Sequence, residues 1–123
     1  MNIVAVFIGG GLGSCARYLL QGAVQRWSGS LFPWGTLVVN IAGSFIIGVL
    51  MASLEERFLV QPSLRLFLTV GILGGFTTFS SFSYETMALL VGGSIGAGIA
   101  NAGMSLCVCL LATWAGFSIG RFI

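Results

Sequence analysis

Three polar side chains interrupt segments that are otherwise strongly apolar. Arg17, Asn40 and Glu85 each lie a few residues inside one end of such a segment. A charged side chain in a bilayer costs roughly 2.5–3.5 kcal/mol even on insertion scales, so it usually marks a functional site. Arg17 can bind an anion or pair with Glu85, and the amide of Asn40 offers two donors. The alternative is a structural role, in which Arg17 and Glu85 form an ion pair and Asn40 bridges two helices.

Hydroxyl and aromatic side chains gather in the third apolar segment. On a helix with about 100° per residue, Thr78, Ser81 and Glu85 fall within one narrow stripe, and Phe82 lies beside it. Phe79 and Phe82 are neighbours at i and i+3. Aromatic ring edges carry partial positive charge, so rings that are held edge-on can coordinate an anion. Phenylalanine in a membrane helix is usually ordinary packing, and only the flanking hydroxyl groups favour coordination here.

The last apolar segment carries a second polar row. Asn101, Ser105 and Cys109 are spaced four residues apart, so they share one face of a helix. Two polar rows on neighbouring helices predict a narrow, weakly polar conduit. Such a lining suits a small anion, because hydroxyl, amide and ring-edge donors replace its hydration without a dense positive charge that would trap it.

The composition places these residues in a membrane protein. Of 123 residues, 57% are hydrophobic and only 7% are charged, whereas a soluble domain carries about 25% charged residues. Four segments reach the length of about 20 residues that a spanning helix needs. The predicted helices cover about residues 3–24, 35–54, 63–91 and 94–117. The sequence therefore predicts one all-α domain over residues 1–123, with four transmembrane helices and both termini on one side.

Composition also excludes several classes of function. The chain has no lysine and no histidine, and its net charge is only +2. This argues against a nucleic-acid surface and removes the usual general base and metal ligands. No pair of nucleophile and base is present, so an enzyme is not expected. Cys15, Cys107 and Cys109 lie in apolar runs and are interpreted as small apolar filler.

Glycine predicts both an irregular backbone and close packing. Gly74 and Gly75 lie near the middle of the third segment and are followed, after Phe76, by two threonines, which predicts a helix break. Irregular backbone at that depth is tolerated only when protein or an aqueous cavity surrounds it. Small residues four apart should also bring helices close together. These pairs are Gly9 and Gly13, Ser44 and Gly48, Gly71 and Gly75, and Gly116 and Gly120.

Charged residues show only a weak bias between the two predicted ends. One end has Arg57, Arg65 and Arg121, opposed by Glu55 and Glu56, and the other end has Arg17 and Arg26. So small a difference permits insertion in either orientation. Four short helices do not easily enclose a pore, so we expect a homodimer whose subunits are antiparallel.

Three stretches resemble the dual-topology fluoride channel family of bacteria and fungi. They are Gly9–Leu19, Gly35–Asn40 and Gly74–Ser83, the last followed by Glu85. The resemblance covers the whole chain and is most specific in the third stretch. It implies a passive, fluoride-selective channel in the bacterial inner membrane, which exports fluoride from the cytoplasm and lowers its toxicity.

The resemblance also implies roles for individual residues. Phe79 and Phe82 would coordinate fluoride with their ring edges, and Asn40 would donate a hydrogen bond to it. Arg17 would shape the vestibule, with Ser81 and Ser105 in a polar track and Thr78 and Glu85 completing the pathway. The subunits would form an antiparallel dimer with two pores. A structural sodium ion at its centre would be held by the backbone carbonyls of Gly74 and Thr77.

Two features leave other interpretations open. The family often has a hydroxyl where this chain has Cys109, and a thiol is a weaker donor. Glu85 is a single membrane acid, which is also the hallmark of a proton-coupled exporter of the small multidrug type. Such an exporter needs its acid early in the chain, where Arg17 stands instead. A non-transporting assembly subunit is the third alternative.

Overall fold

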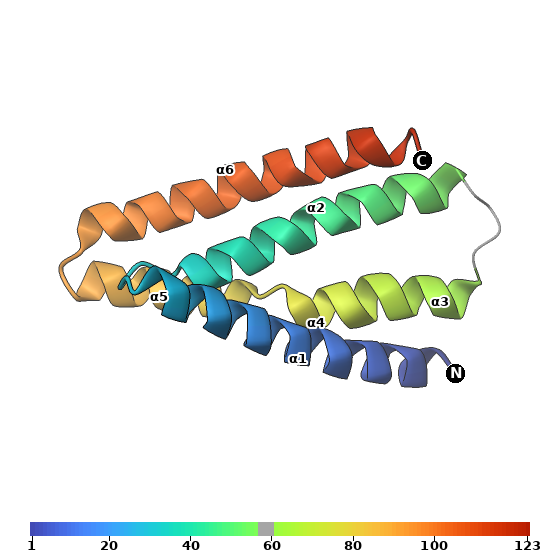
Figure 1. Cartoon of the computed structure of the whole chain (residues 1–123), viewed down its shortest axis with the longest axis horizontal. Helices are drawn as coiled ribbons and strands as arrows, with labels where there is room; N and C mark the ends of the chain where they lie inside the picture. The colour runs from blue at the N-terminus through green and yellow to red at the C-terminus, as the bar shows by residue number, and fades with distance from the viewer. Residues whose placement is uncertain (57–60) are drawn as a thin grey trace.

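Helices make up nearly all of the computed structural model, which describes residues 1–56 and 61–123. The elements are α1 (Asn2–Ser28), α2 (Trp34–Glu56), α3 (Pro62–Leu66), a π-helical segment η1 (Phe67–Leu73), α4 (Gly74–Phe76), α5 (Phe79–Val91) and α6 (Ile95–Gly120). The stretches Asn2–Ser28, Trp34–Leu54, Pro62–Val91 and Ile95–Gly120 are long and apolar enough to cross a membrane. The prediction of a helical chain with four spans is confirmed for the described residues. Both termini lie at the same end of the bundle (Figure 1).

The first and last helices extend beyond the ends that hydropathy predicted. α1 continues through Gln25 and Arg26 to Ser28, and it ends at Gly29, whose φ of 60° and ψ of 16° are left-handed. Glycine adopts this conformation without the steric cost that a Cβ brings. Polar side chains mark the edge of the hydrocarbon layer, but they are good helix formers and do not stop the helix. The predicted charge bias at that end refers partly to the side chains of Glu55 and Glu56 and to Arg57, which lie outside the described residues.

The bundle is built from two closely packed helix pairs, and glycine allows the close approach in each. α1 packs on η1 and α4, and α2 packs on α6 (Figure 1). A Cβ on Gly9 would lie 2.6 Å from the carbonyl oxygen of Phe67, and one on Gly116 would overlap the carbonyl of Phe45. A Cβ on Gly48 would likewise strike the carbonyl of Thr113. The glycine spacing therefore predicted close packing correctly in both pairs.

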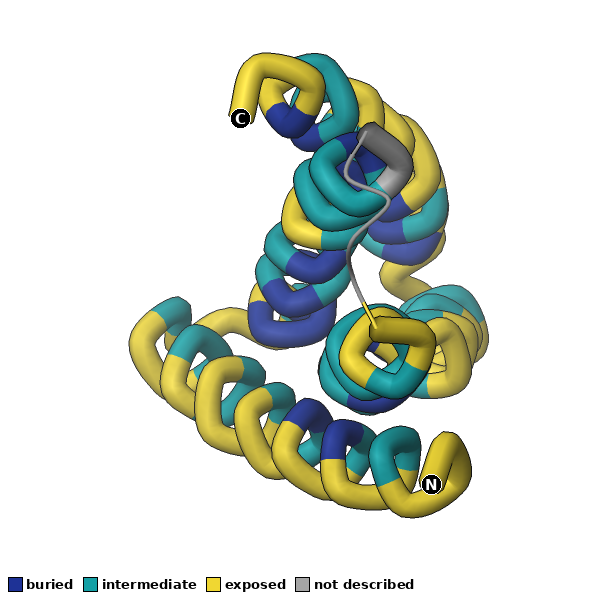
Figure 2. Tube along the Cα trace, turned by 90° about the vertical axis from the view of Figure 1, so that its right-hand side faces the viewer, coloured by how far each residue is buried: buried dark blue, intermediate teal, exposed yellow. Residues whose placement is uncertain are grey.

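Most large apolar side chains lie on the outside. The buried apolar residues among those described are small in number: Leu37, Val39, Ala52 and Leu73. Figure 2 shows buried positions where helices face one another and an exposed outer side along α1. In water such a surface would be unfavourable by about 25 cal/mol per Å². The exposed apolar surface therefore suits a lipid environment.

The third span contains a short extended segment. Thr77 has φ −82° and ψ 156°, and Thr78 has φ −150° and ψ 115°. Gly74, where the sequence suggested the interruption, is helical with φ −62° and ψ −38°. β-branched threonine favours extended backbone, and the Thr78 hydroxyl caps α5 by accepting from the N–H of Ser81 at 3.2 Å. The extended residues are thus the two threonines, three residues further along the chain.

The packing of α1 on the third span predicts a sharp difference between two glycines of α1. Gly13→Ala would drive a Cβ into the carbonyl of Ile72, whereas a Cβ on Gly11 would have nothing within 4 Å. We expect Gly13→Ala to lower the free energy of unfolding by roughly 1–3 kcal/mol, as overpacking does. Gly11→Ala should leave it unchanged or raise it, because alanine is the better helix former. Titration with a denaturing detergent in mixed micelles measures both, and equal stabilities would contradict the packing.

Candidate functional site

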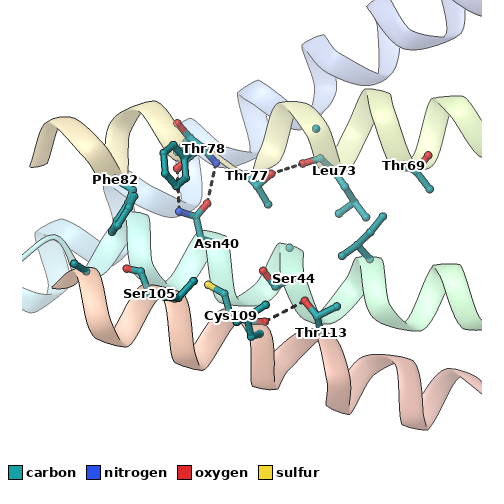
Figure 3. A pocket seen from close by; sticks show the side chains of 17 residues that line it. Asn40, Ser44, Thr69, Leu73, Thr77, Thr78, Phe82, Ser105, Cys109 and Thr113 are labelled. Carbon is teal, nitrogen blue, oxygen red and sulfur yellow. Dashed lines mark hydrogen bonds between the residues drawn. The ribbon is translucent and has the colours of Figure 1, made fainter. Parts of the chain in front are cut away.

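A cleft of about 690 Å³ opens between α2, the third span and α6 (Figure 3). Five residues of the predicted pathway line it: Asn40, Thr78, Phe79, Phe82 and Ser105. Gly74 and Thr77, predicted to hold a sodium ion through their carbonyls, line it as well. Ser81, Arg17 and Glu85 do not belong to its lining. The structure therefore gathers the aromatic, amide and helix α6 hydroxyl groups around one space.

The amide of Asn40 binds the extended segment through two hydrogen bonds. Its Nδ2 donates to the carbonyl oxygen of Thr78 at 3.0 Å, and its Oδ1 accepts from the N–H of Thr78 at 2.8 Å (Figure 3). Each amide nitrogen carries two N–H groups. The second N–H of Asn40 has no partner among the described residues. Asn40 thus bridges two helices, as the structural alternative proposed, and it also lines the cleft.

The extended segment releases two backbone carbonyls. In a continuous helix, the N–H groups of Thr78 and Ser81 would donate to the carbonyls of Gly74 and Thr77. Here they donate to the side chains of Asn40 and Thr78 instead. The carbonyl of Thr77 accepts from Nη1 of Arg17 at 3.4 Å, which is longer than the usual range of about 2.7–3.2 Å. The carbonyl of Gly74 has therefore lost its helical donor, and that of Thr77 keeps only the long contact with Arg17.

The two phenylalanines form one aromatic unit beside this segment. The ring centroids of Phe79 and Phe82 lie 5.2 Å apart, with 56° between the ring planes. A tilted pair of this kind presents ring edges as well as faces to its surroundings. Phe79 is 78% exposed, whereas Phe82 is half-buried. One copy of the chain therefore leaves the aromatic unit open on one side.

The predicted polar row on α6 divides into two parts. Ser105 and Cys109 line the cleft, and Ser105 is buried while its hydroxyl has no hydrogen-bond partner among the described residues. Asn101 lies elsewhere: its Nδ2 donates to the hydroxyl of Thr86 on α5 at 2.8 Å. The prediction that Asn101 lines the conduit is wrong, because the first turns of α6 pack against α5. Ser44 on α2, which the sequence did not lead us to place in the site, lines the cleft instead.

Glu85 takes part in a separate hydrogen-bonded chain. Its Oε1 accepts from the hydroxyl of Thr36 at 2.8 Å, and that hydroxyl accepts from Nε2 of Gln21 at 2.9 Å. The other oxygen, Oε2, is buried without a hydrogen-bond partner among the residues described. The suggested Arg17–Glu85 ion pair is absent from the described part of the chain, because Arg17 reaches the Thr77 carbonyl. The pair was predicted from depth alone, which does not fix the directions in which side chains point.

Gln21 and Thr36 are residues of this network that the sequence did not single out. Each lies one helical turn from a residue that it did, Gln21 four residues after Arg17 and Thr36 four residues before Asn40. Residues four apart lie on one face of a helix. The four-residue spacing from Arg17 and Asn40 could therefore have identified Gln21 and Thr36 from the sequence. Ser81 contacts the extended segment instead, since its hydroxyl accepts from the Thr78 hydroxyl at 3.1 Å.

Comparison with known proteins gives one consistent result. Residues 4–117 match the family described as CrcB-like protein, Camphor Resistance (CrcB). A relative from Geobacter sulfurreducens is 48% identical over 120 residues, covering 98% of this chain and 97% of the relative. One from Magnetococcus marinus is 46% identical over 123 residues, covering 100% of both. One from Opitutus terrae is 50% identical over 113 residues, covering 90% and 86%.

All three of these relatives are named fluoride-specific ion channel FluC. The match extends across all four membrane-spanning stretches and the residues of the cleft. The resemblance identified from the three sequence stretches is confirmed by it. The chain is a multi-pass membrane protein that belongs to the CrcB-like family.

Proposed function

We propose that this chain is a passive, fluoride-selective channel. The names of its relatives support this, at 43–50% identity among those compared. The observation that carries the proposal is the composition of the cleft wall. Among the described residues, one space is lined by Asn40, which has a second amide N–H without a partner, by Ser105, whose hydroxyl has no partner, and by the ring of Phe82. None of these groups bears a full charge.

This wall suits transfer of a small anion. An ion that leaves water must exchange each lost hydration contact for a protein donor, yet it must also leave again. Neutral donors such as Asn40 and Ser105 provide the exchange without a deep electrostatic well. Arg17 lies beside the extended segment rather than in the wall, so it raises the local potential for an anion without binding it directly. Thr78, Ser81 and Glu85 form the polar surroundings of this path.

A second copy is needed to enclose the path. Phe79 is 78% exposed in one copy, and an aromatic coordinating group open on one side cannot exclude water. We therefore place two antiparallel copies together, as the weak charge bias permits. The carbonyls of Gly74 and Thr77 have lost their helical donors, and oxygen ligands suit a hard cation. A structural sodium ion held by these carbonyls from both copies would link the two subunits.

Passive conduction is enough for export and needs no catalysis. Hydrogen fluoride crosses a membrane as a neutral molecule and dissociates in a less acidic interior. The membrane potential then drives the fluoride anion outward through any selective path. A leak of this kind in the inner membrane lowers the fluoride concentration of the cytoplasm and so its toxicity. No energy coupling is required of the protein.

Transport without a proton gradient tests the proposal against a proton-coupled exporter. The buried Oε2 of Glu85, without a partner in the described part of the chain, favours the exporter as the second candidate. We expect liposomes containing the purified chain to release fluoride but not chloride with no proton gradient imposed. Glu85→Gln should alter the rate while leaving it independent of such a gradient. Release that requires a proton gradient and vanishes in Glu85→Gln would establish the exporter instead.

The aromatic pair should be essential for conduction. Phe79→Ile and Phe82→Ile each remove a ring edge and leave an apolar side chain. We expect fluoride efflux to fall by at least roughly tenfold, since a donor to a charged group is worth about 1.5–3 kcal/mol and about 1.4 kcal/mol is a factor of ten. Phe122→Ile is the matched control, because Phe122 is exposed at the C-terminus and does not line the cleft. Full efflux in both pathway variants, with normal gel-filtration behaviour, would contradict the coordination of fluoride by the two aromatic rings.

Asn40 should tolerate no negative charge. Asn40→Asp replaces the free donor by a carboxylate and removes the bond to the Thr78 carbonyl, so we expect fluoride efflux to be abolished by repulsion and by local disorder. Asn2→Asp adds the same charge outside the cleft, where Asn2 accepts from Ser63 at 3.0 Å, and should conduct normally. Thermal stability separates repulsion from misfolding. An Asn40→Asp chain with retained efflux would exclude Asn40 as a fluoride ligand.

A further inference from the structure

Only one of the three cysteines lies on the wall of the cleft. Cys109 lines it one helical turn after Ser105 (Figure 3). Cys15 and Cys107 do not line it, and both are exposed on the outer surfaces of α1 and α6. The carbonyl of Cys109 accepts from the hydroxyl of Thr113 at 3.0 Å, so its backbone acceptor is satisfied. Its thiol has no hydrogen-bond partner among the described residues.

The wall beside Cys109 carries two hydroxyl groups that have no hydrogen-bond partner among the described residues. Ser105 is only 8% exposed, and within the described chain no group bonds to its hydroxyl. Among the described residues, the one buried side-chain oxygen without a partner is Oε2 of Glu85, so the Ser105 hydroxyl is open to the cleft, where a water molecule or a ligand can bond to it. Ser44 lines the same cleft from α2, and its hydroxyl is likewise without a partner among the residues described. A solute that enters with water therefore reaches the thiol of Cys109.

We propose that Cys109 is a binding site for soft metal cations, and that an occupied site closes the cleft to ions. Sulfur ligands select soft metals, whereas the hydroxyl and amide groups of the wall do not compete for them. With mercury(II) chloride, which enters as a neutral molecule, the S–H and one Hg–Cl bond break and an S–Hg bond forms. A proton and a chloride ion leave as the S–Hg–Cl adduct forms. No electron is transferred and no other reagent is needed.

The effect on ion flow follows from the position of the adduct and rests on the function proposed above. A metal on Cys109 stands within one turn of the Ser105 hydroxyl, in the space lined by Phe82 and Asn40. It would occupy the space between these side chains and narrow the path. Conduction requires every site along the path to be accessible in turn. One occupied thiol should therefore stop flow past that copy's wall.

The natural cysteines allow a matched test. The Cys15→Ser/Cys107→Ser chain retains Cys109 alone, and the Cys109→Ser chain retains the other two. Fluoride efflux from liposomes is measured before and after mercury(II) chloride, and each chain is compared with its own untreated rate. We expect the first chain to lose at least roughly tenfold in rate and to recover with excess dithiothreitol. The second should retain most of its rate, and intact mass should show one mercury on the first chain.

Several results would overturn the proposal. Equal inhibition of both chains would place the effect outside Cys109. A mercury adduct on Cys109 without loss of efflux would show that the thiol does not lie in the conduit, and no adduct would show that water does not reach it. Absence of efflux from untreated protein would count against the channel function itself. Intact mass would still decide whether Cys109 binds the metal, because that measurement needs no ion flow.

Discussion

Backbone groups inside a membrane must find partners within the protein, and the amide of Asn40 meets this requirement where the third span becomes extended. Water cannot satisfy a freed N–H or carbonyl in hydrocarbon, and each unsatisfied group costs several kcal/mol. The two hydrogen bonds between Asn40 and Thr78 stabilise the extended conformation. The aromatic pair, the released carbonyls and the start of α5 all take their positions from this segment. The extended segment and the cleft are therefore parts of one arrangement.

Glycine sets the distances that this arrangement needs. α1 approaches the third span closely enough for the Arg17 guanidinium to reach the Thr77 carbonyl, and a side chain at Gly13 would prevent that approach. The second pair, α2 and α6, is joined through Gly48 and Gly116. Because each pair is tight within itself, the remaining space lies between the pairs. That space is the cleft.

The sequence was sufficient for the spans and for part of the site. Hydropathy located four helices because apolar length is a local property, and helical period placed Ser105 and Cys109 on one face. Neither hydropathy nor helical period identified which side chains on other helices these faces contact. Asn101 shares the face of Ser105 but meets Thr86, and Glu85 meets Thr36 rather than Arg17. Partners depend on the rotation and crossing of helices that are distant in sequence, which a single sequence does not encode locally. The position of the extended backbone also depends on a distant partner. Asn40 on α2 binds the backbone of Thr78, so the threonines rather than the glycines are extended.

The interruption at Thr77 and Thr78 also divides one helix dipole into two. The peptide dipoles of α5 sum to roughly half a positive elementary charge at its N-terminus, beside Phe79. Those of the preceding helical stretch leave a comparable negative partial charge at its C-terminus, beside Gly74 and Thr77. Two helix ends with partial charges of opposite sign, neither of which comes from an ionised side chain, thus meet near the middle of the span. One favours an anion and the other a cation. These fixed partial charges carry no proton to lose, so the field that they produce stays constant across the whole range of physiological pH.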